Sequence, residues 1–444
     1  MSLTTSLGLM AVFAVDFIDM IFIAMLGKAE LAAAIGYAGA ILFFTGSFGI
    51  GMAIATGALV ARALGQGDRD LARRRGTNAL IIGLGLGLVF AALIWVNIRP
   101  LVGALGASGA TLDLAVHFMQ IVLPSLPILL IGVVGGAILR AHGDARRSMQ
   151  VMILGGAVNA ALDPVLIFGL DLELTGAALS SIAARVTLAV LALRAIVRHH
   201  GGFDRPRPAA LARDFGGVMR IAGPAVLTQL ATPVGQAIVT RAMANYGEEA
   251  VAGMAIIGRL VPVAFGVLFA LSGAVGPIIG QNAGAGLQNR VIKALRDALL
   301  FTVLVTLLVS AALFALRGPL EVLFKLDGVS RDLVHLFAGP LALMWVFNGM
   351  IFVGNAAFNN LGHPFYSTWI NWGRHTLGTL PFVAAGAALW GAEGVLIGQA
   401  AGGVVFGLLA LWLSWRVVNQ PLTTTEPGNF ARRGRLLEMF LGRR

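Results

Sequence analysis

The chain alternates long runs of apolar residues with short polar stretches that carry most of its charge. An apolar helix of about 20 residues is long enough to cross a hydrocarbon layer of about 30 Å. We identify twelve such runs, and several exceed this minimum, which predicts tilted or kinked helices. They cover residues 3–26, 32–62, 77–98, 113–140, 146–169, 175–198, 217–245, 249–282, 293–316, 332–361, 365–390 and 392–417. The pattern therefore predicts an all-α membrane protein with twelve transmembrane helices.

Composition agrees with this prediction. Of the 444 residues, 58% are hydrophobic and only 12% are charged, and the mean hydropathy is +0.86. The first apolar run continues into a spanning pattern without a small-residue cleavage motif, so we expect no cleaved signal peptide. The sequence contains no cysteine, which excludes disulfides and thiol chemistry.

The net charge of +11 is distributed by loop parity and does not suggest a nucleic-acid partner. Alternate loops and the tail are rich in arginine, as in Arg69 to Arg75, Arg194 to Arg220 and Arg416 to Arg444, whereas the intervening loops hold few basic residues. This positive-inside pattern predicts that both termini are cytoplasmic. The membrane that we expect is the inner (plasma) membrane of a bacterium or archaeon. We expect the basic tail to face lipid headgroups rather than to form a specific binding site.

The two halves of the chain resemble each other at an offset near 220 residues. The stretch Leu26 to Gly36 corresponds to Tyr246 to Ile256, and Leu139 to Asp144 corresponds to Asn359 to Pro364. Six helices per repeat predict two bundles with the same orientation, related by a pseudo-two-fold axis along the membrane normal, with a cleft between them. The expected units are an amino-terminal bundle (1–198), a cytoplasmic linker (199–216), a carboxy-terminal bundle (217–417) and a basic cytoplasmic tail (418–444).

One stretch, Val158 to Gly169 (VNAALDPVLIFG), places an amide, an acid and a proline inside an apolar run. Asp163-Pro164 corresponds to Leu380-Pro381 in the second half, so the proline recurs and the acid does not. The proline therefore indicates shared architecture, and the carboxyl is particular to the first bundle.

Three acids lie well inside the predicted spans: Asp16, Asp19 and Asp163. Each costs about 2.5–3.5 kcal/mol at the centre of an isolated spanning helix, so we expect them to face a cavity or a partner. Counted from the helix ends, Asp19, Asp163 and Ser181 lie at one depth, about 10 Å from the outer surface. Asp16 is either a spare acid facing water or a second proton carrier.

Asn159 shares a helix face with Asp163, and Pro164 leaves the carbonyl of Ala160 without a donor. Such a group of oxygens is suited to a proton on a buried carboxyl or to a sodium ion held by Asp19, Asn159 and Asp163.

Other interior polar residues allow more than one interpretation. Arg185 is a candidate for the substrate cleft, but it is also a possible structural partner for Asp163. Gln229, Thr232 and Gln236 follow one another at helical spacing and either line the cleft or bond neighbouring helices. We expect Arg241, Arg259 and Arg374 to snorkel or to pair inside the bundle rather than to bind substrate.

These motifs resemble the multidrug and toxic compound extrusion (MATE) family of cation-coupled efflux transporters over essentially the whole chain. They are Val15 to Gly27 (VDFIDMIFIAMLG), LVARALGQGD after residue 58, LRAHGD, NAALDP and the AGPA of residues 222–225. The NxxxDP motif with an aspartate on the first span is similar to the DinF-like branch. That resemblance implies a coupling site at Asp19, Asn159, Asp163 and Ser181, with Asp19 matching better than Asp16. The family usually has a short segment before the first span, so we expect the chain to be truncated at its start.

The function predicted from these features is a monomeric antiporter, not an enzyme. It has no cofactor, its coupling ion is H⁺ or Na⁺, and it exports lipophilic, often cationic compounds across the bilayer by alternating access. A flippase for lipid-linked precursors is the alternative. It would need a cleft lined with cations to bind a pyrophosphate, and the interior arginines of this chain are too few and scattered to favour it. An intramembrane aspartyl protease is disfavoured because neither Asp19 nor Asp163 lies in a Gly-x-Gly-Asp context. A channel fits the hydropathy but not the repeat.

Overall fold

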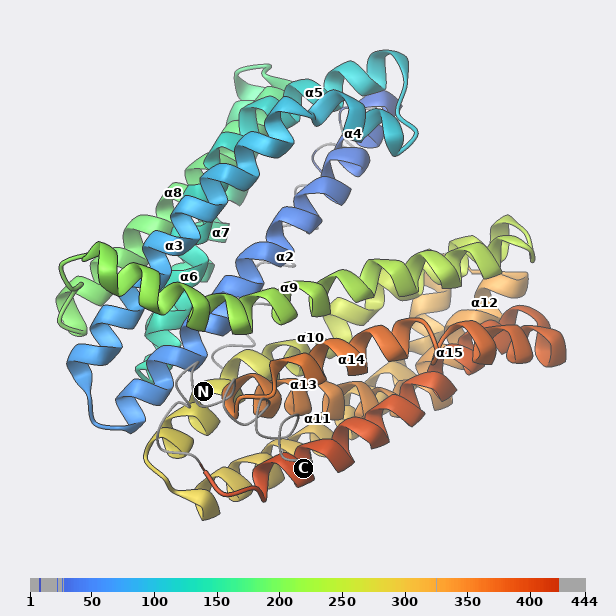
Figure 1. Cartoon of the computed structure of the whole chain (residues 1–444). Coiled ribbons are helices and arrows are strands. Elements are labelled where there is room, and N and C mark those ends of the chain that lie inside the picture. Colours follow the sequence, from blue (N-terminus) through green and yellow to red (C-terminus); the bar gives the residue numbers. More distant parts are fainter. Residues whose placement is uncertain (1–7, 9–21, 23–25, 27, 325, 423–444) are drawn as a thin grey trace, which may run out of the picture.

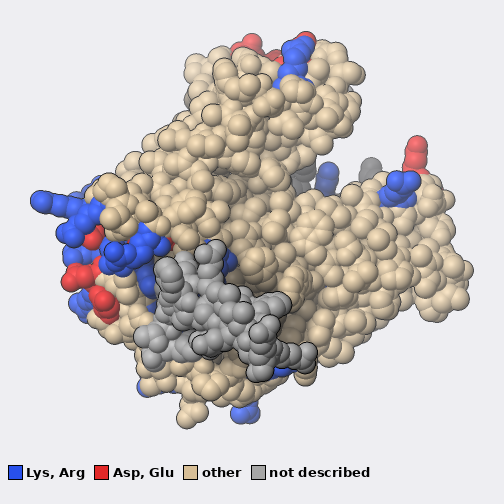
Figure 2. Space-filling view, viewed as in Figure 1, with Lys and Arg blue, Asp and Glu red and all other residues tan. Residues whose placement is uncertain are grey.

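The computed structural model describes residues 8, 22, 26, 28–324 and 326–422. This part of the chain is helical and contains no β-strand. The helices form two arms that meet at one end and diverge toward the other (Figure 1). The space-filling view shows a deep hollow between the arms, and it shows lysine and arginine side chains gathered near the end where the arms meet (Figure 2).

The first arm contains the helices of the amino-terminal half. Several are interrupted rather than continuous: a 3-10 turn at Pro124 divides one span, and a π-helical turn follows Pro164 in another. The elements are α2 (Ala29–Gly65), α3 (Arg69–Val96), α4 (Ile98–Ala104), α5 (Gly109–Val122), η1 (Leu123–Ser125), α6 (Leu126–Ala141), α7 (Ala145–Pro164), η2 (Val165–Gly169) and α8 (Glu173–His199).

The second arm contains the helices of the carboxy-terminal half. One of its spans bends by 61° between η3 and the helix after it. The elements are α9 (Pro208–Ala244), α10 (Glu248–Gly284), α11 (Gln288–Phe324), α12 (Gly328–Leu336), η3 (Phe337–Leu341), α13 (Trp345–Asn360), α14 (Pro364–His375) and α15 (Leu380–Val418).

Eight helices of the described residues are long and apolar enough to cross a membrane, or nine with the bent pair counted as one span. The segment Pro364–Val418 counts once among these, although it folds back on itself at Trp390 and Gly391, where the backbone leaves the helical region. Added to these are α9, whose polar residues lower its hydropathy, and the run 3–26, which lies almost entirely outside the described residues. The predicted twelve-span layout fits this arrangement.

Close approach between the two segments of α15, before and after the break at Trp390 and Gly391, depends on glycine. A Cβ on Gly386 would lie 2.9 Å from the carbonyl carbon of Gly394, and one on Gly398 would lie 2.5 Å from that of Phe382. No side chain fits between helices whose backbones are this close, which is why small residues dominate such membrane interfaces.

The two halves obey one register. Glycines with positive φ recur 219 residues apart, because 286 − 67, 328 − 109 and 362 − 143 all equal 219; the pairs are Gly67 and Gly286, Gly109 and Gly328, and Gly143 and Gly362. These glycines end helices or occupy tight turns that other residues adopt at a cost. The spans from α2 to the start of α7 therefore match those from α10 to the start of α14 without a gap.

The arms cross where α2 meets α10. A Cβ on Gly65 would lie 2.7 Å from the carbonyl carbon of Gln281, and one on Gly284 would lie 3.0 Å from that of Arg62. Both pairs obey the 219-residue register, so the contact is reciprocal. The Gln281 side-chain amide adds a hydrogen bond of 2.6 Å to the carbonyl of Ala141. We call this contact of Arg62, Gly65, Gln281 and Gly284 the crossing point; it closes the arginine-rich end.

α9 begins at Pro208, earlier than the predicted residue 217, and the non-helical connection after α8 is correspondingly short. Its first turns pack on the first arm, where Val218 and Ala222 belong to an apolar cluster with residues of α2, α3, α6 and α8. The predicted start at residue 217 follows the first continuous apolar run, so it omits the more polar first turns of α9. α9 joins the two arms at the arginine-rich end (Figure 1).

Candidate functional site

Asp163 lies in the last turn of α7 and is 1% exposed. Among the described residues, Asp163 is the only buried acid. Pro164 follows it and has no N–H to donate, and the chain then continues as the π-helical turn η2. The break in the helix thus lies immediately beside the buried carboxyl.

Two side chains bind this carboxyl. Asn159 donates from Nδ2 to Oδ2 at 3.1 Å, and the Ser180 hydroxyl oxygen lies against Oδ1. The same Ser180 oxygen lies 2.9 Å from the carbonyl oxygen of Ala177. Asn159 and Ser180 are themselves buried. Asp163, Asn159 and Ser180 therefore form one enclosed polar site, which we call the Asp163 site.

Glycines bring α8 close enough for Ser180 to reach Asp163. A Cβ on Gly176 would lie 2.7 Å from the carbonyl carbon of Leu166, and one on Gly155 would lie 2.7 Å from the Leu188 side chain. Ser180 is one turn beyond Gly176 on the same face of α8.

The structure brings together Asn159 and Asp163 as predicted, but the serine is a different one. Ser181 is next to Ser180 in α8, is half-buried and does not contact Asp163. Adjacent helical residues differ by about 100° in direction, so only one of the two can face α7. The sequence prediction selected the neighbouring residue, and the helix face distinguishes the two serines.

Asp16 and Asp19 lie outside the described residues. Two described residues of their predicted span contact the helix that carries Asp163. A Cβ on Gly8 would lie 3.2 Å from the sulfur of Met152 in α7, and the Phe22 ring packs edge-on against Phe168 of η2 with a centroid distance of 6.0 Å.

Arg185 is not a partner of Asp163 in this structure. Its Nη1 donates to the carbonyl of Val122 at 3.1 Å and to the Ser125 hydroxyl at 2.8 Å. Both acceptors lie at the 3-10 break between α5 and α6, where the helix leaves backbone carbonyls without donors. Arg185 therefore caps a helix break inside the first arm.

The predicted cleft residues of α9 lie on an accessible face. Thr232 and Gln236 are exposed and Gln229 is half-buried. Thr228, one turn before Thr232, is buried and bonded to the carbonyl of Pro224 at 2.8 Å. Arg259 of α10 and Arg241 of α9 are also exposed, and neither forms an ion pair with any described residue.

The second arm contains a buried amide network that the sequence analysis did not select. Asn371 of α14 donates to Asn355 of α13 at 3.2 Å, and Ser367 donates to Asn359 at 3.2 Å. The sequence signal is a pair of asparagines at helical spacing, Asn355 and Asn359, with Asn371 in the next helix. These groups are neutral and bonded to one another, so they hold α13 against α14 and provide no ionisable site.

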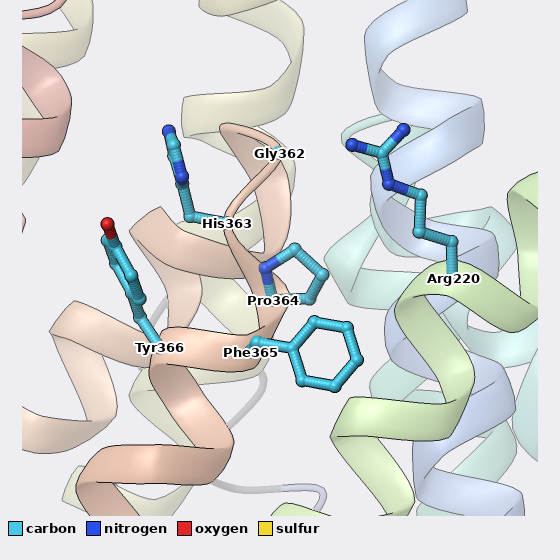
Figure 3. Close-up of a pocket in the computed structure, with 6 residues that line it drawn as sticks. All are labelled: Arg220, Gly362, His363, Pro364, Phe365 and Tyr366. Carbon is cyan, nitrogen blue, oxygen red and sulfur yellow. The ribbon is translucent and has the colours of Figure 1, made fainter. Parts of the chain in front are cut away.

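A small recess lies at the arginine-rich end, away from the Asp163 site. Arg220 of α9 faces the turn and first residues of α14 across it, and the rings of His363 and Tyr366 lie side by side (Figure 3). Those two rings stack at 5.2 Å. Gly362 permits the turn because its φ is +90°.

Outside the spans, the rings of His142 and His200 lie beside Asp144, tilted by 39° with their centroids 4.5 Å apart. Burial lowers the pKa of His142, because it disfavours the imidazolium. Burial raises the pKa of Asp144, but hydrogen bonds from Arg147 and His200 outweigh it, so the net shift is downward. His200 Nε2 and Arg147 Nη1 lie 3.0 Å and 2.6 Å from Asp144 Oδ2.

Comparison with known proteins follows this geometry. The MatE family model matches residues 5–165 and 224–382. The chain is 29% identical to the FAD transporter of Shewanella oneidensis, over 96% of this chain and 95% of that protein. It is 28% identical to the multidrug export protein MepA of Staphylococcus aureus, over 56% and 55% of the two chains.

Among solved structures, the Vibrio cholerae MATE transporter VcmN in the bent form has the same fold. It superposes with a TM-score of 0.90 at 23% identity, over 96% of this chain and 97% of that one. A MOP superfamily transporter from Pyrococcus furiosus, described as having a binding pocket of reversed polarity, superposes with a TM-score of 0.86 at 21% identity, over 94% of each chain.

Proposed function

Since this chain belongs to the MATE family, and is therefore a multi-pass membrane transporter of small molecules rather than an enzyme, we propose that it is an antiporter driven by cation binding at the Asp163 site. Substrate leaves by alternating access of the cleft between the arms. The ion is H⁺, with Na⁺ as the alternative, and Asp19 of the first span completes the site.

The hydrogen-bond inventory of the Asp163 site supports the choice of H⁺. Ser180 has one hydroxyl proton, yet two acceptor oxygens lie against its oxygen, Oδ1 of Asp163 and the carbonyl of Ala177. An ionised carboxyl takes the Ser180 proton, and the Ala177 carbonyl then keeps only the backbone N–H bond of α8. A protonated carboxyl donates to Ser180, and Ser180 then donates to Ala177.

Loss of the proton would therefore unbalance the site. A buried, ionised carboxyl needs a new donor or access to water. The break at Pro164 and η2 is the part of this arm best able to move, because its backbone bonding is already irregular. Proton release and rearrangement of the cleft are in this way linked through one residue.

The orientation follows from the arginine-rich end, which we assign to the cytoplasm with both termini, in a bacterial or archaeal plasma membrane. The crossing point then closes the cytoplasmic side, and the hollow in Figure 2 opens outward. The Asp163 site in this arrangement is loaded from outside, the direction in which a proton enters. The transporter acts as a monomer.

Transport in proteoliposomes tests this proposal. Purified protein is reconstituted, and efflux of a fluorescent lipophilic cation is measured under imposed pH or Na⁺ gradients. Asp163→Asn is expected to abolish acceleration by the pH gradient. The matched control is Asp171→Asn, an exposed acid in the turn after η2. Gradient-driven transport that is equal in wild type and Asp163→Asn would refute the coupling site.

The substrate class has two candidates. Lipophilic cations are the expectation from the family and from MepA. A bulky anion of the FAD type is favoured by the near full-length similarity to the Shewanella protein and by Arg259 and Arg241, which are exposed and form no ion pair with the part of the chain that the structure describes. FAD carries a pyrophosphate, which guanidinium groups bind well, and flat rings suited to an apolar cleft.

A competition experiment separates the two candidates. Vesicles loaded with FAD or with the fluorescent cation are compared for wild type and Arg259→Gln. Loss of FAD efflux with retained cation efflux supports the anionic substrate. If FAD is not moved by the wild type, the lipophilic cation remains the substrate class.

A further inference from the structure

The hairpin of α7 and α8 carries the Asp163 site on its two helices. Asp163 and Asn159 lie on α7, and Ser180 lies seven residues, about two turns, after the start of α8. Between the two helices the chain passes through η2 and a short turn of residues 170–172. The conformation of this turn fixes how α8 lies against α7, and therefore whether Ser180 reaches the carboxyl of Asp163.

Two residues at this turn have an unusual backbone conformation. Asp171 (φ +53°) and Glu173 (φ +43°) are the only residues other than glycine with positive φ in the part of the chain that the structure describes. Asp171 follows a helix end at which the Leu172 N–H bonds to the carbonyl of Leu166 at 3.1 Å, and such a position commonly takes positive φ. Aspartate also tolerates this region. The conformation of Asp171 is thus an ordinary helix ending.

Glu173 lacks this explanation. It is the first residue of α8, where the regular helix has negative φ. The left-handed region is disfavoured by about 5- to 30-fold for a residue with a long side chain. A strained residue persists only where surrounding contacts hold it, and such residues gather at sites that change conformation. The contacts of Glu173 therefore indicate what holds the turn.

An ion pair joins Glu173 to the end of the first span. Lys28 Nζ lies 2.5 Å from Glu173 Oε1. Lys28 directly precedes α2, and it follows the first span that the sequence predicts at residues 3–26. Phe22 of that span contacts the Phe168 ring of η2 at a centroid distance of 6.0 Å. The first span thus meets the hairpin at η2 and, through Lys28, at the first residue of α8.

The ion pair is weak enough to break during transport. The Lys28 and Glu173 side chains are 59% and 33% exposed, and an exposed pair changes an equilibrium by only about 1.4- to 5-fold. Backbone bonds supply the rest of the support, because the N–H groups of Thr175 and Gly176 bond to the carbonyl of Leu172 at 2.9 Å and 3.1 Å. Strain at Glu173 opposes these contacts, so loss of the ion pair favours relaxation of the turn.

We propose that Lys28 and Glu173 form a latch that positions the Asp163 site. The latch is closed while Ser180 contacts Asp163, and it opens when the first span moves away from the hairpin. Opening lets Glu173 leave the left-handed region, which shifts the start of α8 and withdraws Ser180 from the carboxyl. This inference rests on the proposed coupling role of Asp163. Lys28 and Glu173 do not bind the ion, so both are positioning residues.

Substitutions test the latch through the pH profile of transport. Lys28→Gln and Glu173→Gln each remove one charge, and we expect pH-driven efflux from proteoliposomes to fall by about 1.4- to 5-fold, with a shifted pH midpoint. The double exchange Lys28→Glu with Glu173→Lys rebuilds the pair and should restore both quantities. Arg99→Gln is the matched control, because it removes another exposed ion pair of the first arm, Arg99 with Asp113 at 2.7 Å, and it should transport normally.

Hydrogen exchange of the hairpin measures the latch independently of transport. In protein reconstituted in lipid nanodiscs, the amides of residues 170–176 should exchange faster in Lys28→Gln than in the wild type or Arg99→Gln. Higher ionic strength should speed this exchange in the wild type but not in Lys28→Gln, because salt screens exposed ion pairs.

The outcomes separate the latch from the coupling site. Equal hydrogen exchange in the wild type and Lys28→Gln would overturn the latch, as would a transport defect that the double exchange does not restore. If Lys28→Gln and Glu173→Gln transport like the wild type while Asp163→Asn does not, the latch is wrong and the coupling site stands. Normal pH-driven transport by Asp163→Asn would refute the coupling site, and with it the positioning role, whatever the hydrogen exchange shows.

Discussion

The crossing point of α2 and α10 gives the most direct test of how this transporter closes one side. A Cβ on Gly65 would lie 2.7 Å from the carbonyl carbon of Gln281, whereas carbon atoms in contact are about 3.5–4.0 Å apart. Gly65→Ala therefore requires the helices to separate locally by about 1 Å. Overpacking of this kind costs about 1–3 kcal/mol. This overlap, and its cost, is absent when the two helices separate at the crossing point.

This cost acts only on the closed crossing point, so it shifts the equilibrium between the two cleft conformations. At about 1.4 kcal/mol per tenfold, the population ratio changes by about 5- to 150-fold. Gly284→Ala affects the reciprocal contact and should shift the equilibrium in the same direction. The shift favours opening at the arginine-rich end and closing at the other.

The absence of cysteine from the sequence makes the measurement straightforward. Spin labels on Arg69→Cys and Leu287→Cys report the separation at the arginine-rich end by double electron–electron resonance. Labels on Leu105→Cys and Leu323→Cys report the opposite end. Gly65→Ala should lengthen the first distance and shorten the second in reconstituted protein.

Two glycines elsewhere on the same helices provide controls. Gly46 of α2 and Gly273 of α10 have no neighbouring atom within 4 Å of a built Cβ. Alanine at these positions gains the same helix propensity, about 1 kcal/mol, without overlap. Distance distributions that stay unchanged in Gly65→Ala, or that shift equally in the controls, would refute the idea that this contact holds the end closed.

Three further predictions concern the site and the packing around it. Ser180→Ala should weaken pH-driven efflux from proteoliposomes severalfold, and Ser181→Ala should leave it near wild type, because Ser180 is the serine that contacts Asp163. Equal effects of the two substitutions would argue for Ser181 as the site residue, as the sequence predicted. Arg185→Met should lower unfolding free energy by about 1.5–3 kcal/mol, the range for hydrogen bonds to a charged group, without changing the pH dependence of transport; thermal melts and efflux assays check both parts, and altered pH dependence would mean that Arg185 contacts the coupling pathway. The lowered pKa of half-buried His142 means that the unfolded chain binds a proton more readily than the folded protein, so stability should fall as pH drops below 6.5. His142→Gln should make the melting temperature less dependent on pH between 7.5 and 5.5. An equally steep pH dependence in the variant would exclude His142 as the cause.

Hydropathy determined the helical class and the spans, because each spanning helix must satisfy its own backbone bonds in lipid, and corresponding motifs at one offset indicated the repeat. The sequence also selected Asp163 as a candidate site residue, since a lone acid beside a proline in an apolar run is costly without a purpose. The recurrence of glycines at one register could be read as a repeat from sequence. The sequence could not show that these and other glycines are the points where the carbonyls of one helix meet the α-carbons of another.

The tertiary structure decided which of two adjacent serines faces Asp163, because helix rotation is set by packing against glycines far away in the chain. It likewise decided that Arg185 caps a helix break and that α9 begins on the first arm. Residue order fixes position along each helix but not the face that each helix turns to its neighbours.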